Sequence, residues 1–262
     1  MPQGLKLYSF YSLSHRPLAE QWFLPSLKDN FLLCIDSDKT RGSGYYKDPS
    51  WCCSIQKKVS LILKALTENP NGVFVFSDVD IQFFKKTEPF IVSLMTRWDL
   101  AVLRDSPKGT LGTGFFACRS TPKTIRLWQD VERQMARCPE KHDQEALNDL
   151  WIAASPWYLR LLWKILSFLG AIPFLTTGVL PLMVLLRPCL GNRYGIRLGY
   201  FPASFFSPGV FSERIWAPGD ALDIPRDVVL HHANWTNGVE NKIAQLAFVR
   251  GLIGGEVNHA KT

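Results

Sequence analysis

Two kinds of segment follow one another along this chain. Some are short apolar runs, and in the others apolar side chains recur three and four positions apart. Short runs bounded by turn residues are typical of buried strands, and the second spacing is typical of amphipathic helices. Segments of the two kinds follow one another, which favours an α/β fold with a mostly parallel sheet. The predicted strands cover residues 5–11, 31–35, 73–76, 100–103 and 197–202. The predicted helices cover residues 18–27, 51–66, 90–96, 121–137, 146–152 and 243–252.

Two carboxylates follow the apolar run 73–76, at Asp78 and Asp80. Side chains two positions apart share one face of an extended segment, so both can point at one divalent cation beyond the strand. Ligands of open α/β sheets bind at that end of the strands. The aromatic and β-branched neighbours would bury the two carboxylates, and an unpaired buried carboxylate costs several kcal/mol. The pattern therefore predicts a metal site, although an Asp-x-Asp triplet also arises in turns and at solvated strand ends.

A second candidate ligand follows the apolar residues 228–230, where two histidines stand in sequence at His231 and His232. Imidazole together with two carboxylates suits Mn²⁺. A lone histidine in such a place is more often structural. The residues alone leave both interpretations open.

Three further segments carry polar side chains or glycines that a ligand could use. Lys57 and Lys58 lie on the polar side of the helix 51–66, where one of them could reach a diphosphate or both could be solvated. The glycines of the segment 109–114 would let the backbone approach a ligand closely, or serve a tight turn. That segment lacks the Gly-Lys-Ser/Thr ending of a Walker loop. Asp143 and Gln144 open a helix, where they could cap it or bind sugar hydroxyls.

Two loops could contact a nucleotide base. The loop 12–17 contains His15 and follows the first strand, and the loop 36–50 contains Tyr45 and Tyr46. Tyrosine rings in such a loop can stack on a base or only cover the core. A plain connecting role is equally consistent with either loop.

Composition and charge narrow the class of protein. A chain of 262 residues with 47% hydrophobic content can form a sizeable core, and we predict a single domain over 1–262. A net charge of +7 favours anionic partners such as nucleotides, phosphates or an anionic membrane surface. The basic residues are scattered and no helix-turn-helix or RNA-binding signature is present, so nucleic acid is not an expected partner.

The six cysteines and the N-terminus point to a cytoplasmic protein. The cysteines show no Cys-x-x-Cys spacing, which favours reduced thiols and argues against structural zinc. The first residues lack the basic and apolar regions of a signal peptide. We therefore expect a cytoplasmic location, with peripheral membrane contact as an option.

Four stretches together resemble the nucleotide-diphospho-sugar transferase family of GT-A-type glycosyltransferases. They are FVFSDVDIQFF, GTGFFACRSTPKTIRLW, HDQEALN and LHHANWTNGVENKIAQL. They occur in the order and spacing of the family and cover roughly residues 5–150 and 192–250. The resemblance implies a GT-A, Rossmann-like fold, with a mostly parallel sheet flanked by helices.

The resemblance also implies roles for individual residues. Asp78 and Asp80 would bind Mn²⁺ or Mg²⁺ bridging the two phosphates of the donor, with His232 as an additional ligand. Asp143 and Gln144 would be the catalytic residues beside the transferred sugar. Relatives commonly carry Asn-Thr-Gly-Phe where this chain begins with Gly112, so a donor contact by that asparagine is missing here. The residues implied in binding the nucleotide sugar are Gly112, Thr113, Gly114, Asn234 and Lys242, the last of which would neutralise the leaving diphosphate. Lys57, from its place on the helix 51–66, is a further residue that we expect to bind the nucleotide sugar.

The implied activity is a metal-dependent transfer of a sugar from a nucleotide-diphosphate sugar, most consistently a UDP-sugar, to a glycan or lipid-linked acceptor. Enzymes that resemble this chain are usually of the retaining type. Asp143 could then stabilise the oxocarbenium-like sugar or act as a nucleophile. One alternative is a nucleotidyltransferase, which also needs paired carboxylates on a metal. The other is an inactive GT-A-like binding protein held at a membrane.

Residues 151–190 form an apolar helical insertion that the resemblance does not explain. The run 165–186 is uncharged for 22 residues and has aromatic and basic neighbours, as a transmembrane helix has. A single crossing would place Asp143 and His232 on opposite sides of a membrane, which is incompatible with a shared site. Pro173 and Pro181 divide the run into short pieces. A hairpin at the membrane surface is therefore expected, or a helical subdomain packed on the core or on a partner.

Overall fold

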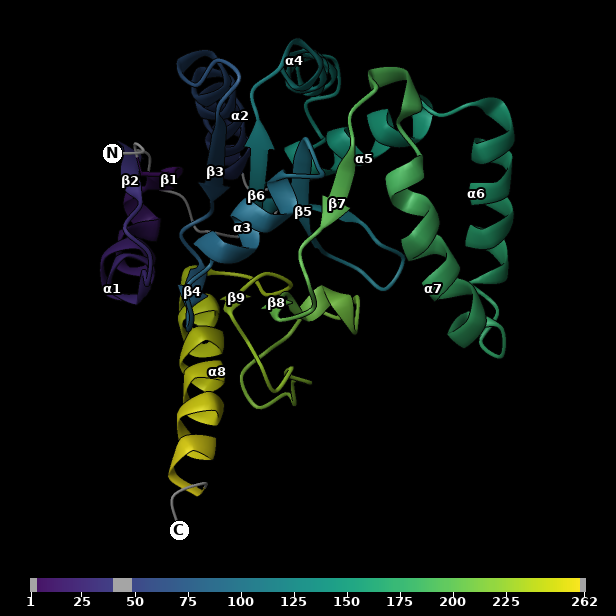
Figure 1. Cartoon of the computed structure of the whole chain (residues 1–262). Helices are drawn as coiled ribbons and strands as arrows, with labels where there is room; N and C mark the ends of the chain where they lie inside the picture. Colours follow the sequence, from purple (N-terminus) through teal and green to yellow (C-terminus); the bar gives the residue numbers. More distant parts are fainter. Residues whose placement is uncertain (1–3, 40–48, 260–262) are drawn as a thin grey trace.

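A six-stranded sheet lies at the centre of the computed structural model, which describes residues 4–39 and 49–259 (Figure 1). The strand order is β2-β1-β3-β6-β5-β7, and only the pairs made by β6 are antiparallel. The predicted α/β fold with a mostly parallel sheet is confirmed. The strands are β1 (Lys6–Ser12), β2 (Leu32–Asp38), β3 (Val73–Ser77), β5 (Leu100–Arg104), β6 (Leu111–Arg119) and β7 (Leu198–Tyr200).

Both faces of the sheet are buried. Successive side chains of a strand point to opposite faces, and in the central strands the side chains on both faces are apolar. Phe74 and Phe76 of β3 join one core cluster, and Val75 between them joins the other. The first cluster lies under α2 (Pro49–Glu68), α4 (Pro122–Arg137) and α5 (Asp143–Ala153), and it includes Trp128. The second lies under a π-helical turn (Leu18–Phe23) that continues into α1 (Leu24–Ser26), and under α3 (Glu88–Met95).

A second, three-stranded sheet crosses below the first and was not predicted. Its order is β4-β9-β8, and it pairs Ile81 with His232 although 150 residues separate them. These strands have only two or three residues each, too short for a periodic signal. Their bounds are β4 (Ile81–Phe83), β8 (Phe205–Phe206) and β9 (Leu230–His232).

Two predicted features differ from the structure in detail. The glycines of the segment 109–114 were expected to admit a ligand or to form a tight turn, but Gly112 and Gly114 lie within β6 itself. The terminal helix was expected over 243–252, and α8 runs over Val239–His259. Tyr45 and Tyr46 lie outside the described residues.

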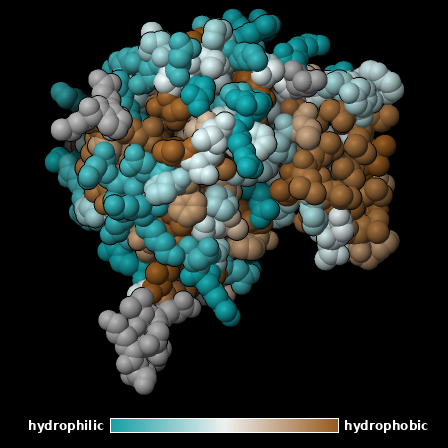
Figure 2. All heavy atoms as spheres, in the orientation of Figure 1, coloured by the Kyte–Doolittle hydropathy of each residue, from teal (hydrophilic) through white to brown (hydrophobic). Residues whose placement is uncertain are grey.

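The insertion folds as a helical hairpin beside the sheet, on the side away from β2 (Figure 1). Its helices are α6 (Trp157–Leu169) and α7 (Thr176–Leu186), and Pro181 lies inside α7. Among the described residues, no helix has the length and apolar character needed to cross a membrane. Trp163, Val179 and Met183 form a buried inner seam that belongs to the main core. The outer side of the hairpin forms the large hydrophobic area at the right of Figure 2.

Candidate active site

Asp78, Asp80 and His232 converge where the two sheets meet. The backbone N–H of Asp78 donates to the carbonyl of Gly114 at 2.7 Å, which fixes the chain as it leaves β3. The carbonyl of Asp80 accepts from the N–H of Ala233 at 2.8 Å, which holds Asp80 beside the end of β9. One side-chain atom from each of the three residues lies within 4.8 Å of the other two. The pairing of β4 with β9 thus brings together two acids and an imidazole from distant segments.

Two basic groups contact the carboxylate of Asp80, which is 4% exposed. His232 Nε2 lies 3.3 Å from its Oδ1, and Lys242 Nζ donates to its Oδ2 at 2.6 Å. Burial alone favours the neutral acid, but the charges of Lys242 and His232 outweigh it and lower the pKa of Asp80 well below its usual value. The reciprocal attraction overcomes burial and raises the pKa of His232. The carboxylate of Asp80 is therefore ionised at neutral pH.

Lys58 links Asp78 to Asp143. Its buried ammonium lies 3.0 Å from Asp78 Oδ2 and 3.1 Å from Asp143 Oδ2. Burial opposes its charge, but Asp143 and Asp78 together raise the pKa of Lys58. Burial also favours a neutral Asp143, and the charge of Lys58 reverses this and lowers the pKa of Asp143. The pair therefore keeps a charged carboxylate in an almost fully enclosed position.

The three converging side chains fit a hard divalent cation. Asp80 Oδ1 is buried and has no hydrogen-bond partner in the described part of the chain. Such an atom is costly unless something pairs with it, and a cation would. Two carboxylate oxygens and an imidazole nitrogen form a donor set that suits Mn²⁺ or Mg²⁺.

Gly114 leaves space for the imidazole of His232 to pack against β6. A Cβ at position 114 would lie 2.2 Å from His232 Cε1, so only glycine leaves room for the ring in its present place. Gly112 has a looser environment, in which a Cβ would lie 3.1 Å from the carbonyl oxygen of Leu103. Of these two glycines, Gly114 is therefore the one that the packing of His232 requires.

Gln144 and Asn234 meet on a buried acid that the sequence did not single out, Asp105. The amide of Gln144 donates to Asp105 Oδ2 at 2.7 Å and accepts from the N–H of Thr113 at 3.2 Å. The amide of Asn234 donates to Asp105 Oδ1, which also accepts from Ser207 Oγ at 2.7 Å. Asp105 directly follows the apolar strand β5, which is the signal that also identified Asp78. This network fixes Gln144 by both ends of its amide.

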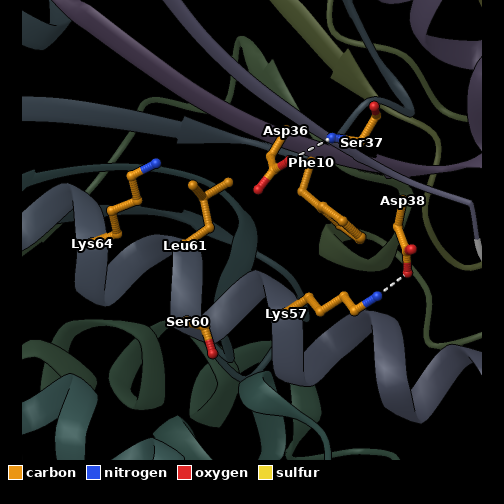
Figure 3. Close-up of a pocket in the computed structure, with 8 residues that line it drawn as sticks. All are labelled: Phe10, Asp36, Ser37, Asp38, Lys57, Ser60, Leu61 and Lys64. Carbon is orange, nitrogen blue, oxygen red and sulfur yellow. Dashed lines mark hydrogen bonds and ion pairs between the residues drawn. The ribbon is translucent and has the colours of Figure 1, made fainter.

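Lys57 points away from the converging acids. Its ammonium pairs with Asp38 in an open pocket between α2 and the ends of β1 and β2 (Figure 3). Lys58, its neighbour, is the lysine that reaches Asp78. The pocket is lined by Phe10, Asp36, Ser37, Asp38, Lys57, Ser60, Leu61 and Lys64.

The predicted base-contacting loop 12–17 lies near Lys242. Ser12 Oγ and His15 Nδ1 are 2.9 Å apart, which orients the imidazole. Burial and the charge of Lys242 lower the pKa of His15 to about 4. The ring is therefore neutral at physiological pH and can exchange hydrogen bonds with a polar ligand.

Comparison with known proteins identifies a family for most of this chain. The family model described as nucleotide-diphospho-sugar transferase matches residues 23–246. No curated protein matches. Among solved structures, a glycosyltransferase involved in the glycosylation of the major capsid of PBCV-1 is similar at 9% identity and a TM-score of 0.51, covering 93% of this chain and 99% of that one. The bifunctional glycosyltransferase WbbM is similar at 6% identity and a TM-score of 0.50, covering 94% of this chain but 50% of that chain.

Proposed function

Because this chain belongs to the nucleotide-diphospho-sugar transferase family and is thus a glycosyltransferase, we propose that its reaction depends on Mn²⁺ or Mg²⁺ held by Asp78, Asp80 and His232. Family membership favours glycosyl transfer over the nucleotidyl transfer that paired carboxylates also permit. The donor is a nucleotide-diphosphate sugar, for which we propose a UDP-sugar. For the acceptor we propose a glycan or a lipid-linked acceptor.

The observation that carries this proposal is the position of Asp80 Oδ1, which is buried, has no hydrogen-bond partner among the described residues, and lies 3.3 Å from Nε2 of His232. One side-chain atom each of Asp78, Asp80 and His232 lies within 4.8 Å of the other two, so a single cation would bind all three side chains. Asp78, Asp80 and Asp143 bring three acids to the site, and Lys58 and Lys242 bring two permanent positive charges. A divalent cation would add two positive charges to this set, which suits a diphosphate.

The reaction needs negative charge to be stabilised on the leaving diphosphate. A bound divalent cation would supply electrostatic stabilisation of that charge. Lys242, 2.6 Å from Asp80, stands beside the cation position and can donate to a phosphate oxygen as the sugar leaves. His15, from the neighbouring loop, has a neutral imidazole that can form a hydrogen bond with the nucleotide sugar.

Asp143 is the group that we propose acts on the sugar. Its lowered pKa keeps it ionised, so it can stabilise a positive, oxocarbenium-like sugar or attack the anomeric carbon. Lys58 holds this carboxylate at 3.1 Å, and Thr113 also contributes to its ionised state. Gln144 supports the site by orienting Asp105 and the backbone of β6. We propose retention of anomeric configuration, which the NMR spectrum of the product sugar would test.

A panel of nucleotide sugars tests the proposed function. Purified protein is incubated with each sugar and Mn²⁺, and released nucleoside diphosphate is measured before and after chelation with EDTA. We expect release with at least one donor, lost on chelation and restored by added Mn²⁺ or Mg²⁺. Asp80→Asn keeps the side-chain volume but weakens the ligand set, and should lower the rate by about 100-fold or more.

Asp149→Asn is the matched control, because Asp149 is a half-exposed acid that pairs with Lys141 on the surface. Its rate should stay within about twofold of the parent, as for a surface ion pair. Release that survives both EDTA and Asp80→Asn would refute the metal-dependent mechanism.

A further inference from the structure

The outer side of the α6–α7 hairpin exposes a continuous set of large apolar side chains. The described part of the chain has 18 large apolar residues that are exposed, and nine of them lie between positions 157 and 185. Phe174 at the hairpin tip is 82% exposed, and Leu185 and Phe168 are 73% and 71% exposed. Exposed apolar areas of this kind mark sites of association. We call this set the apolar face, and its members are Trp157, Tyr158, Leu161, Leu162, Ile165, Phe168, Phe174, Leu182 and Leu185.

The hairpin is held firmly against the body of the protein, so the apolar face has a defined orientation. Trp163 of α6 packs in the main core, and its ring lies 4.7 Å from the guanidinium of Arg187. Arg187 is buried and donates to Asn148 of α5. Asn148 in turn binds both backbone groups of Leu111 at 2.9 Å. The hairpin is thus connected through buried hydrogen bonds to β6, the strand that carries Gly114.

The charge distribution around the apolar face selects its partner. The sequence has no Asp or Glu between Asp149 and Glu213, and five Arg or Lys residues in the same interval. Two of them, Arg160 and Lys164, lie exposed on α6 beside the apolar face. If a second copy of the chain packed on this face, Arg160 and Lys164 of the two copies would lie close together and repel each other. An anionic lipid surface accepts the apolar side chains and attracts the charges.

The dimensions of the hairpin fit the interface of a bilayer. Thirteen residues of α6 measure about 20 Å and eleven of α7 about 17 Å, against a hydrocarbon core of about 30 Å. Trp157 and Tyr158 stand at the start of α6, and such rings favour the level of the lipid headgroups.

We propose that the apolar face of the α6–α7 hairpin docks the protein on the surface of an anionic phospholipid bilayer. The apolar side chains enter the headgroup region, and Arg160 and Lys164 contact lipid phosphates. This docking is independent of the transferase chemistry, so it can hold or fail without affecting the proposed function.

Flotation of the full chain with vesicles tests the docking. The protein is mixed with vesicles of phosphatidylcholine alone, or of equal parts phosphatidylcholine and phosphatidylglycerol, and centrifuged in a density gradient. We expect flotation with the anionic vesicles, weaker flotation with neutral vesicles, and partial loss at high salt. Absence of flotation with both kinds of vesicle would overturn the proposal.

Two variants separate the apolar and electrostatic contributions. The triple variant Phe168→Ser, Phe174→Ser and Leu185→Ser should lower binding to anionic vesicles by more than about tenfold. The double variant Arg160→Glu and Lys164→Glu should abolish the preference for anionic over neutral vesicles. The matched control, Val92→Ser with Ile215→Ser, removes exposed apolar side chains elsewhere and should bind as the parent does.

The remaining outcomes discriminate against other partners of the apolar face. All substituted side chains are exposed, so circular dichroism of each variant should match the parent. A triple variant that floats like the parent contradicts the proposal. So does a parent that is dimeric by light scattering, fails to float, and becomes monomeric in the triple variant, because a second copy then covers the face.

Discussion

Lys57 and Lys58 are adjacent in the sequence but have very different environments. Lys57 is half exposed and pairs with Asp38 at the rim of the open pocket, whereas Lys58 is buried between Asp78 and Asp143. The ammonium of Lys58 compensates the charge of Asp143, whose side chain is only 3% exposed. Its removal would leave the carboxylate of Asp143 uncompensated.

We predict that Lys58→Met lowers the free energy of unfolding by about 3 kcal/mol, because breaking a buried ion pair strands its partner. Nucleotide-sugar cleavage should fall strongly as well, because Asp143 loses its ion pair. Lys57→Met, the adjacent control, should change stability by at most about 1 kcal/mol. Urea denaturation of the two variants measures the difference. Equal effects of the two substitutions would contradict the assigned arrangement.

The sequence predicted several site residues but not all of their neighbours. Asp78, Asp80 and His232 could be chosen because the two acids come just after the apolar run 73–76 and the imidazole comes just after the apolar residues 228–230. The choice between Lys57 and Lys58 depends on the rotation of α2 against the sheet, which packing decides and local pattern does not. Asp105 follows β5 in the same way as Asp78 follows β3, and was identifiable by that rule. Its hydrogen bonds to Gln144 and Asn234 are visible only in the fold.

At the scale of elements, strands β6 and β9 approach each other unusually closely at the candidate site. Gly114 makes this possible, because a Cβ there would overlap the ring of His232. The two strands belong to different sheets, so their contact sets how the sheets are joined around the acids.

We predict that Gly114→Ala displaces His232 and weakens Mn²⁺ binding by about 10- to 100-fold, as loss of a supporting contact at a metal site does. Isothermal titration of EDTA-treated protein with Mn²⁺ measures this. Gly178→Ala is the control, because a Cβ at Gly178 in α7 meets nothing within 4 Å. It should leave Mn²⁺ binding unchanged and stabilise the helix by up to about 1 kcal/mol. Unaltered binding in Gly114→Ala would show that the imidazole is not a ligand.

Elements with a clear local pattern were predictable, including the three-residue β7 within the strand expected over 197–202, whereas the strands of the second sheet were not. The helix expected over 51–66 and the strand expected over 73–76 correspond to α2 and β3, because each has a periodic pattern over enough residues. β4, β8 and β9 have no such length, and their pairing is between segments far apart in the sequence. The antiparallel direction of β6 likewise depends on a crossover that local pattern does not encode.

At the scale of the whole molecule, the α6–α7 hairpin is joined through Arg187 and Asn148 to β6, the strand that also contributes Gly114 to the candidate site. The uncharged run of the insertion is compatible with a membrane span when it is considered as sequence. In the fold it is divided between α6 and α7, and Trp163, Val179 and Met183 are buried on the inner side. Only tertiary packing separates the apolar residues that build the core from those that remain exposed.

Crystals grown with MnCl₂ and a nucleoside diphosphate test the central claim most directly, through the anomalous scattering of manganese. The account predicts one strong anomalous peak in contact with carboxylate oxygens of Asp78 and Asp80 and a ring nitrogen of His232, with the diphosphate bound on its open side near Lys242. The same crystals of Asp80→Asn should show a much weaker peak. A nucleoside diphosphate bound with no manganese among these three residues would contradict the account.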